Sequence, residues 1–180
     1  MQHFKRTLIL ILLFVKISIL QLYSLDNNAS VILISLDGFR WDYFKSEYCT
    51  YLNEIADFGV KAQSLKPQFP SMTFPNHYSI ITGLYPANHG IIANHFKNPI
   101  DDTYFSIKAP SVKDAIWYRG EAFWETARRN GIITASYFWP GSEMNLEYRR
   151  PNYFEEYEHN RPYDERVKGV LNWLKLPDSL

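Results

Sequence analysis

The chain has 180 residues, of which 46% are hydrophobic and 21% are charged, so it can bury the core of one domain and does not resemble a disordered chain. Its 19 Lys and Arg residues balance its 19 Asp and Glu residues, and this balance indicates neither a nucleic-acid-binding surface nor a polybasic membrane patch. The single cysteine, Cys49, excludes an intrachain disulfide.

The first 24 residues differ in character from the rest. Lys5 and Arg6 precede an apolar run over residues 8–22, which only Lys16 interrupts. A basic segment followed by an apolar one is typical of a secretory signal peptide, which we expect over residues 1–24. The small-residue cleavage signal is weak, so an uncleaved signal anchor is the alternative, although Lys16 would then lie inside the membrane.

A glycosylation motif follows the apolar run and is relevant if the chain enters the secretory pathway. Asn28-Ala29-Ser30 is an N-glycosylation sequon, and a glycan on Asn28 is expected if the chain is secreted or reaches the cell surface. Membrane association is expected only through the N-terminal segment or through an anchor beyond this sequence.

The first elements of the folded part are predicted from apolar runs and their stop signals. Residues 31–36 are continuously apolar apart from one serine and end at Asp37, which favours a central parallel strand. A helix is expected over residues 51–58, with Gly59 as its stop. A second strand is expected over residues 60–65.

The next predicted helix begins at Thr73-Phe74-Pro75, with Pro75 near the first helical position and Thr73 just outside. It should end at Gly83. Residues 85–117 are rich in Asn, Pro and Asp and are expected to be irregular.

The last elements are predicted to be a helix over residues 121–129, a strand over residues 132–139 and a helix over residues 162–176. Strands that alternate with helices predict an α/β domain with a mostly parallel sheet flanked by helices. No strand follows the last helix, so the sheet is expected to be incomplete at the C-terminus.

Asp37 and Thr73 suit catalysis by type and position. Asp37 follows a predicted strand, where ligands of parallel sheets bind, although Asp-Gly more often forms a turn. Thr73 at a helix start is commonly a cap, but the same place faces N–H groups that stabilise a bound phosphate. A divalent metal on the hydroxyl oxygen would make it a nucleophile.

Several long motifs resolve these alternatives. From about residue 31 to residue 177 the chain resembles the nucleotide pyrophosphatase/phosphodiesterase family of the alkaline phosphatase superfamily. The motifs that carry the resemblance are Ser35-Leu36-Asp37-Gly38-Phe39-Arg40, Phe69-Pro70-Ser71-Met72-Thr73-Phe74-Pro75-Asn76-His77-Tyr78, Thr82-Gly83-Leu84-Tyr85-Pro86, His89-Gly90-Ile91-Ile92-Ala93-Asn94 and Tyr137-Phe138-Trp139-Pro140-Gly141-Ser142.

The resemblance implies that residues 25–180 are the N-terminal part of a catalytic domain with two zinc ions and a covalent phospho-threonine intermediate. It makes Asp37 a zinc ligand, Thr73 the nucleophile and a ligand of the same zinc, and Asn94 a donor to the phosphate in the transition state. The family's other five zinc ligands lie beyond the end of this sequence. The 180-residue chain alone is therefore expected to be inactive.

The resemblance also implies a substrate pocket. Phe74 and Tyr157 match residues that hold a nucleotide base between two rings, and Ile107 and Trp139 match residues that flank it. The alternative for each aromatic residue is a place in the core. His77 and His89 lie inside the family motifs but match no zinc ligand there, and no spacing supports His95 or His159 as metal ligands. Structural roles are expected for His77 and His89, and surface positions for His95 and His159.

The function implied is zinc-dependent hydrolysis of phosphodiester or pyrophosphate bonds in extracellular nucleotides. The expected partner is a nucleotide or another small phosphodiester. One alternative is a choline-phosphodiester hydrolase of the same family. The other is a non-catalytic, truncated secreted or membrane protein.

Overall fold

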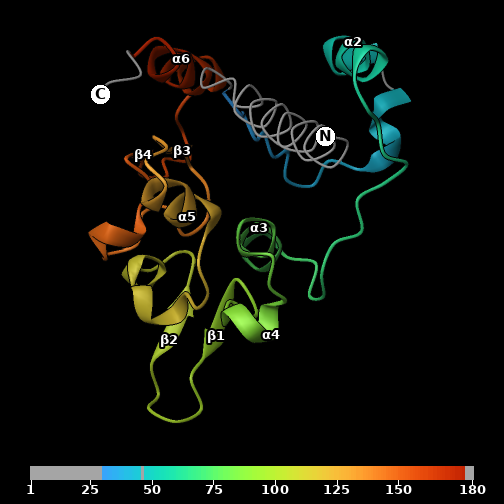
Figure 1. Cartoon of the computed structure of the whole chain (residues 1–180). Coiled ribbons are helices and arrows are strands. Elements are labelled where there is room, and N and C mark those ends of the chain that lie inside the picture. The colour runs from blue at the N-terminus through green and yellow to red at the C-terminus, as the bar shows by residue number, and fades with distance from the viewer. Residues whose placement is uncertain (1–29, 46, 177–180) are drawn as a thin grey trace, which may run out of the picture. The chain divides into compact units, whose positions relative to one another are not determined.

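The structure is a computed structural model that describes residues 30–45 and 47–176 (Figure 1). The predicted signal peptide or anchor over residues 1–24 and the sequon at Asn28 lie outside the described residues. The chain divides into two compact units, Met1–Phe39 and Arg40–Leu180. Within the described ranges, no helix is long and apolar enough to span a bilayer.

The described residues of the first unit contain no strand, so the strand predicted over residues 31–36 is wrong. The run lies exposed, and Val31 retains 93% of its accessible surface. A strand requires a hydrogen-bonded neighbour, and none of the described segments supplies one, whatever the propensity of the sequence. Asp37 and Gly38 instead form a turn that the Phe39 N–H closes onto the Leu36 carbonyl oxygen at 3.2 Å.

The second unit begins with two short 3-10 helices, η1 (Trp41–Lys45) and η2 (Glu47–Cys49), and continues into helix α2 (Thr50–Phe58). The helix predicted over residues 51–58 is therefore confirmed. The strand predicted over residues 60–65 is wrong, because these residues form neither helix nor strand and are exposed. As in the first unit, a segment without a paired neighbour stays outside any sheet.

Helix α3 (Thr73–Thr82) confirms the helix predicted at this place and ends as expected at Gly83, whose φ of 69° is left-handed. Its start differs by one residue. Met72 is the N-cap, and Thr73 is the first helical residue rather than the one before it. The N–H groups of the first turn have no partner within the helix, so proline, which lacks an N–H, is tolerated anywhere in that turn. Pro75 lies at the third position of α3 and therefore does not define where the helix starts.

The prediction that residues 85–117 are irregular is wrong, because the structure shows five short elements there. Helix α4 (Pro86–His89) comes first, and the 3-10 helices η3 (Pro110–Lys113) and η4 (Ala115–Trp117) come last. Between them, β1 (His95–Lys97) and β2 (Tyr104–Ser106) form an antiparallel pair, visible as a hairpin in Figure 1. Strands of three residues are too short to give an alternating pattern that a sequence reveals.

The remaining elements are α5 (Phe123–Arg129), β3 (Ala135–Tyr137), η5 (Glu147–Arg149), β4 (Tyr153–Glu155) and α6 (Tyr163–Trp173). Strand β3 pairs in parallel with β4, so that Tyr137 lies opposite Glu155. The α/β class is confirmed. Among the described residues the strands form one antiparallel and one parallel pair rather than a single large sheet.

Aromatic side chains dominate the core of the second unit. The Tyr78 ring packs against the Tyr118 ring edge to face, with centroids 5.1 Å apart, and Phe105 lies 5.9 Å from Tyr118. Tyr78, Tyr118 and Phe105 are each exposed by 2% or less. Because Tyr78 belongs to α3, this cluster fixes the helix whose first residue is Thr73.

A buried histidine braces the other end of α3. The Ile91 N–H donates to Nδ1 of His89 at 3.2 Å, so the proton of the neutral ring is on Nε2, which lies 3.0 Å from Oγ of Ser79. The His89 side chain has no exposed surface, and its other ring contact is the edge of Tyr78. Burial lowers the pKa of His89 below its usual value of 6.5.

The His89 pKa predicts a loss of stability in mild acid. The unfolded chain takes up a proton on this histidine near pH 6.5, whereas the folded protein resists protonation. The contribution of His89 is therefore fully present above pH 6.5 and falls as the pH drops toward the lower folded pKa. Denaturant unfolding of the full-length protein at pH 7.5 and pH 5.5 measures this loss. A His89→Gln variant with the same pH dependence as the wild type would contradict it.

Candidate active site

The loop that precedes Thr73 is held by the side chain of Asn76, a residue of α3. Asn76 donates from Nδ2 to the carbonyl oxygens of Pro70 and Met72, at 3.0 Å each, and accepts the Gln68 N–H at 2.7 Å. A single amide thus ties the loop before the helix to the first turn of the helix. Thr73 follows this loop directly, so its backbone has a defined entry into α3.

Asn94 lies beside the start of α3, as the candidate site requires. Its Oδ1 accepts the backbone N–H of Phe74 at 3.1 Å. The first N–H groups of a helix lack partners within the helix, and Asn94 satisfies one of them from a loop 20 residues away. Because Oδ1 faces this N–H, Nδ2 is the other end of the amide and carries two N–H groups that can donate elsewhere. Such donors are what an anionic phosphate oxygen needs.

Phe74 and Ile107 join the same group of residues. The Ile107 N–H donates to the Asn94 carbonyl oxygen at 3.1 Å, which continues the β1–β2 pairing toward α3. The Phe74 ring is half-buried and lies 5.9 Å from the Phe105 ring of the core. Phe74 therefore contacts the core on one side and keeps part of its surface exposed beside Thr73.

Trp139 and Tyr157 occupy equivalent places at one edge of the parallel pair. Each lies two residues beyond the carboxyl end of its strand, and the last residues of the two strands, Tyr137 and Glu155, are paired. Trp139 reaches α3, because its Nε1–H donates to the His77 carbonyl oxygen at 3.1 Å. Ligands of α/β sheets bind at this edge of the strands.

The Tyr157 ring is 57% exposed and packs edge to face against Phe138, with centroids 5.3 Å apart. Its hydroxyl group lies 3.1 Å from Nδ1 of His159. Phe138 has a φ of 67°, which is uncommon for a residue with a side chain and turns the chain sharply after β3. The structure gives no contact between Tyr157 and Phe74.

The candidate metal ligand Asp37 and the candidate nucleophile Thr73 belong to different compact units. Asp37 belongs to the first unit and is exposed in the turn after residues 31–36. Among the histidines, His77 and His89 are buried and His95 and His159 are exposed. Over residues 30–45 and 47–176 no three His, Cys, Asp or Glu side chains come together in a way that could hold a metal ion.

Sequence reasoning missed one contact of Thr73. Nδ1 of His77 lies 2.7 Å from the Thr73 carbonyl oxygen. The signal was present, because residues four apart lie on the same face of a helix. The family motif contains both residues but does not show that they touch.

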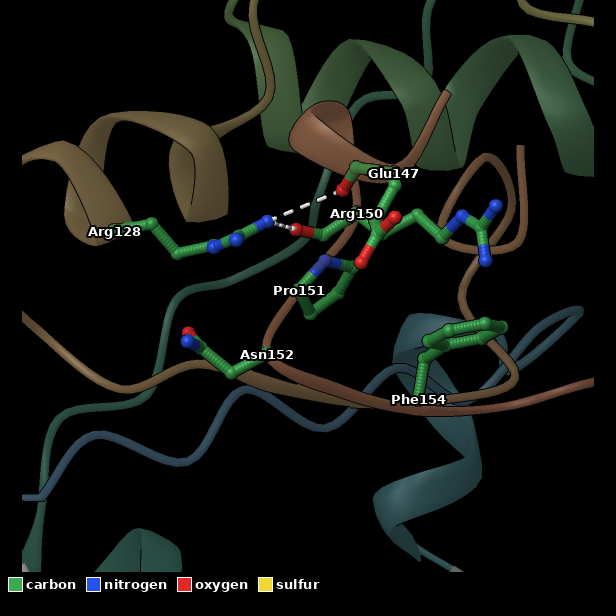
Figure 2. Close-up of a pocket in the computed structure, with 6 residues that line it drawn as sticks. All are labelled: Arg128, Glu147, Arg150, Pro151, Asn152 and Phe154. Atoms are coloured by element: carbon green, nitrogen blue, oxygen red, sulfur yellow. Dashed lines mark hydrogen bonds between the residues drawn. The ribbon is translucent and has the colours of Figure 1, made fainter. Parts of the chain in front are cut away.

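A separate cavity lies between α5 and β4 (Figure 2). The guanidinium group of Arg128 donates there to the carbonyl oxygens of Glu147 and Arg150. The volume of this cavity is about 190 Å³, whereas pockets for drug-sized ligands measure roughly 300–1,000 Å³. None of the candidate residues lines it, so it is not part of the site at α3.

Comparison with known families gives one match over most of the chain. The sequence profile of the type I phosphodiesterase / nucleotide pyrophosphatase family matches residues 31–180. The matched range contains all of the candidate catalytic, substrate and metal residues.

Similar proteins include ectonucleotide pyrophosphatase/phosphodiesterase family member 1 of Mus musculus, which is 38% identical over 148 residues, or 81% of this chain and 16% of that protein. An uncharacterized pyrophosphatase/phosphodiesterase of Schizosaccharomyces pombe is 41% identical over 84% of this chain and 32% of its own length. The venom phosphodiesterase of Macrovipera lebetinus is 38% identical over 84% of this chain and 18% of its own length. The chain thus spans a third or less of each of these relatives.

Solved structures agree with the sequence relatives. Murine ectonucleotide pyrophosphatase/phosphodiesterase 5 superposes with a TM-score of 0.78 at 30% identity, over 83% of this chain and 40% of that one. An inactive form of the same murine protein, with a threonine replaced by alanine and in complex with AMP, superposes with a TM-score of 0.75 at 30% identity. This superposition covers 80% of this chain and 39% of the murine chain.

Proposed function

Because this chain belongs to the type I phosphodiesterase / nucleotide pyrophosphatase family, we propose that the full-length protein hydrolyses phosphodiester or pyrophosphate bonds of nucleotides with Thr73 as nucleophile. The observation that carries the proposal is the start of α3. Thr73 is its first residue, and Asn94 is bonded to the next backbone N–H. A hydroxyl group, a helix N-terminus and an amide donor thus meet at one place.

These groups suit phosphoryl transfer. Oγ of Thr73 attacks the phosphorus and gives up its proton, while the bond to the leaving oxygen breaks and that oxygen takes up a proton from solvent. Water later hydrolyses the threonine ester, which releases the nucleotide and returns a proton to Oγ. The reaction depends mainly on position and on stabilising charge at the phosphate oxygens. The N-terminal end of α3 and the Asn94 amide both place positive partial charge there. The inactive threonine-to-alanine form of the murine relative supports a catalytic threonine.

Zinc dependence is part of the proposal on the ground of the family resemblance. Asp37 and Thr73 offer oxygen donors that zinc accepts, but a zinc site needs three or four protein ligands. The described residues contain no cluster of three such groups. The residues present therefore do not by themselves fit a zinc site.

A nucleotide is the preferred substrate. The relative bound to AMP supports it, and so do the aromatic side chains beside the strand ends, since stacking on a base is worth about 1–3 kcal/mol. Phe74, Trp139 and Tyr157 each keep exposed or half-exposed surface for such a contact. Relatives named as ectonucleotide enzymes and as a venom phosphodiesterase support a secreted or cell-surface location.

The direct test compares two chromogenic diesters. Full-length protein produced in secretory cells should release p-nitrophenol from the p-nitrophenyl ester of thymidine monophosphate faster than from p-nitrophenylphosphorylcholine. The reverse preference would favour the choline-phosphodiester alternative. Hydrolysis of neither, with folded and secreted protein, would favour the non-catalytic alternative.

Asn94→Ala in the full-length protein should lower kcat on the order of 100- to 1,000-fold, because the transition state loses one amide donor. Asn94→Asp is the informative partner, since it keeps an oxygen for the Phe74 N–H but removes both N–H donors. It should lose at least as much activity. If Asn94→Asp retained the wild-type kcat, the bond to Phe74 would be the only role of this residue.

A further inference from the structure

The peptide unit that joins Thr73 to Phe74 is held at both ends by side chains. At one end, the Thr73 carbonyl oxygen lies 2.7 Å from Nδ1 of His77. At the other end, the Phe74 N–H donates to Oδ1 of Asn94 at 3.1 Å. Rotation of this unit would change the direction of the Thr73 side chain, so the two bonds together restrict where its Oγ can lie.

The first of these bonds determines the tautomer of His77. A carbonyl oxygen can only accept, so Nδ1 of His77 must carry the proton. The residue is 9% exposed, which leaves little competition from water for the bond. The neighbouring His89 has the opposite tautomer, because its Nδ1 accepts the Ile91 N–H. The two buried histidines of this region are therefore not equivalent.

A third contact holds His77 itself. The Trp139 Nε1–H donates to the His77 carbonyl oxygen at 3.1 Å from a position 62 residues away, and the two rings pack edge to face at 5.3 Å. The loop that follows β3 thus fixes the second turn of α3. His77 passes this restraint to Thr73 in the first turn.

We propose that His77 is a positioning residue for Thr73: its Nδ1–H holds the Thr73 carbonyl oxygen while Asn94 holds the next N–H, and the hydroxyl group is thereby aimed at the phosphate. The inference rests on the proposed function of Thr73 as nucleophile. It assigns to His77 neither contact with substrate nor binding of metal.

The test uses the full-length protein and a nucleotide diester. His77→Ala should lower kcat on the order of 10- to 100-fold with KM nearly unchanged, because a misplaced nucleophile slows the chemical step and not substrate binding. His77→Asn should recover much of the loss, since an asparagine side chain can place an N–H near the position of Nδ1. His95→Asn is the matched control, because the His95 ring contacts Ser106 instead, and it should behave as the wild type.

Thr73→Ala, measured in the same series, separates this inference from the proposed function. Wild-type turnover by Thr73→Ala would refute the nucleophile itself. An inactive Thr73→Ala together with an unchanged kcat in His77→Ala would refute only the positioning role. A parallel loss in His77→Ala and His77→Asn would also refute it, because the N–H would then not matter.

One measurement does not depend on how well the variants fold. Wild-type protein labelled with ¹⁵N in its histidine rings should show His77 with the proton on Nδ1. A neutral His77 with the proton on Nε2 would overturn the proposal, since that ring could not donate to the Thr73 carbonyl oxygen.

Discussion

Replacing Thr73 with alanine in the full-length protein is expected to abolish turnover, with a loss in kcat on the order of 10⁵-fold or more, in the range seen when hydrolases lose their nucleophile. Thr73 is the first residue of α3 and precedes the N–H that Asn94 binds. Alanine keeps the helix and this bond but has no oxygen to attack phosphorus. Steady-state hydrolysis of a nucleotide diester measures the effect.

Thr73→Ser is the matched control for this variant. It keeps the hydroxyl group and loses only a methyl group, so a measurable part of the activity should survive. Both variants should unfold at the wild-type temperature, because Thr73 is only partly buried. Thr73→Ala with more than a tenth of the wild-type kcat would remove Thr73 from the mechanism.

The largest expected effect on stability is at Arg149. Its guanidinium group donates to Glu125, to the carbonyl oxygens of Tyr118 and Gly120 and to the Tyr78 hydroxyl group. The side chains of Arg149 and Glu125 are only 13% and 11% exposed. Arg149→Ala should therefore lower the free energy of unfolding by about 3 kcal/mol, because it leaves the Glu125 carboxylate without its cationic partner in a poorly hydrated place.

A second ion pair that includes a residue of α5 gives the control. Arg129 pairs with Glu121 at 2.7 Å, and their side chains are 63% and 40% exposed. Solvent screens such a pair, so Arg129→Ala should have a small effect. Denaturant unfolding of both variants makes the comparison. Equal effects at the two positions would show that Arg149 is no more important to the fold than a surface residue.

The longer helices α2, α3, α5 and α6 could be predicted from the sequence, because their signals are local. Gly83 ends α3 in the left-handed conformation that glycine favours, and α2 ends just before Gly59. Among the described strands, β3 (Ala135–Tyr137) lies within the strand predicted over residues 132–139. The other three could not be predicted, because pairing is decided by distant residues. The apolar residues 31–36 have the composition of a buried strand and no paired neighbour among the described residues. In contrast, β4 pairs with β3 although the sequence around Tyr153–Glu155 gave no strand signal.

The candidate site was predictable only in part for the same reason. The motifs named Thr73, Phe74 and Asn94, and the structure places these three within a few bonds of one another. The shared position of Trp139 and Tyr157 at one sheet edge depends on β4 and could not be derived without it. The spacing of four residues allows His77 to reach the Thr73 carbonyl oxygen, but no local pattern indicates that the His77 carbonyl oxygen accepts a bond from Trp139, 62 residues away.

The most direct measurement is the chemical identity of the reaction intermediate. Full-length protein mixed with a nucleotide diester and quenched in acid within the first turnover should yield a peptide whose mass is increased by the nucleotidyl group on Thr73. The same peptide from Thr73→Ala should be unmodified. Rapid turnover by the wild type with no adduct on Thr73, or with an adduct on another residue, would contradict Thr73 as the nucleophile.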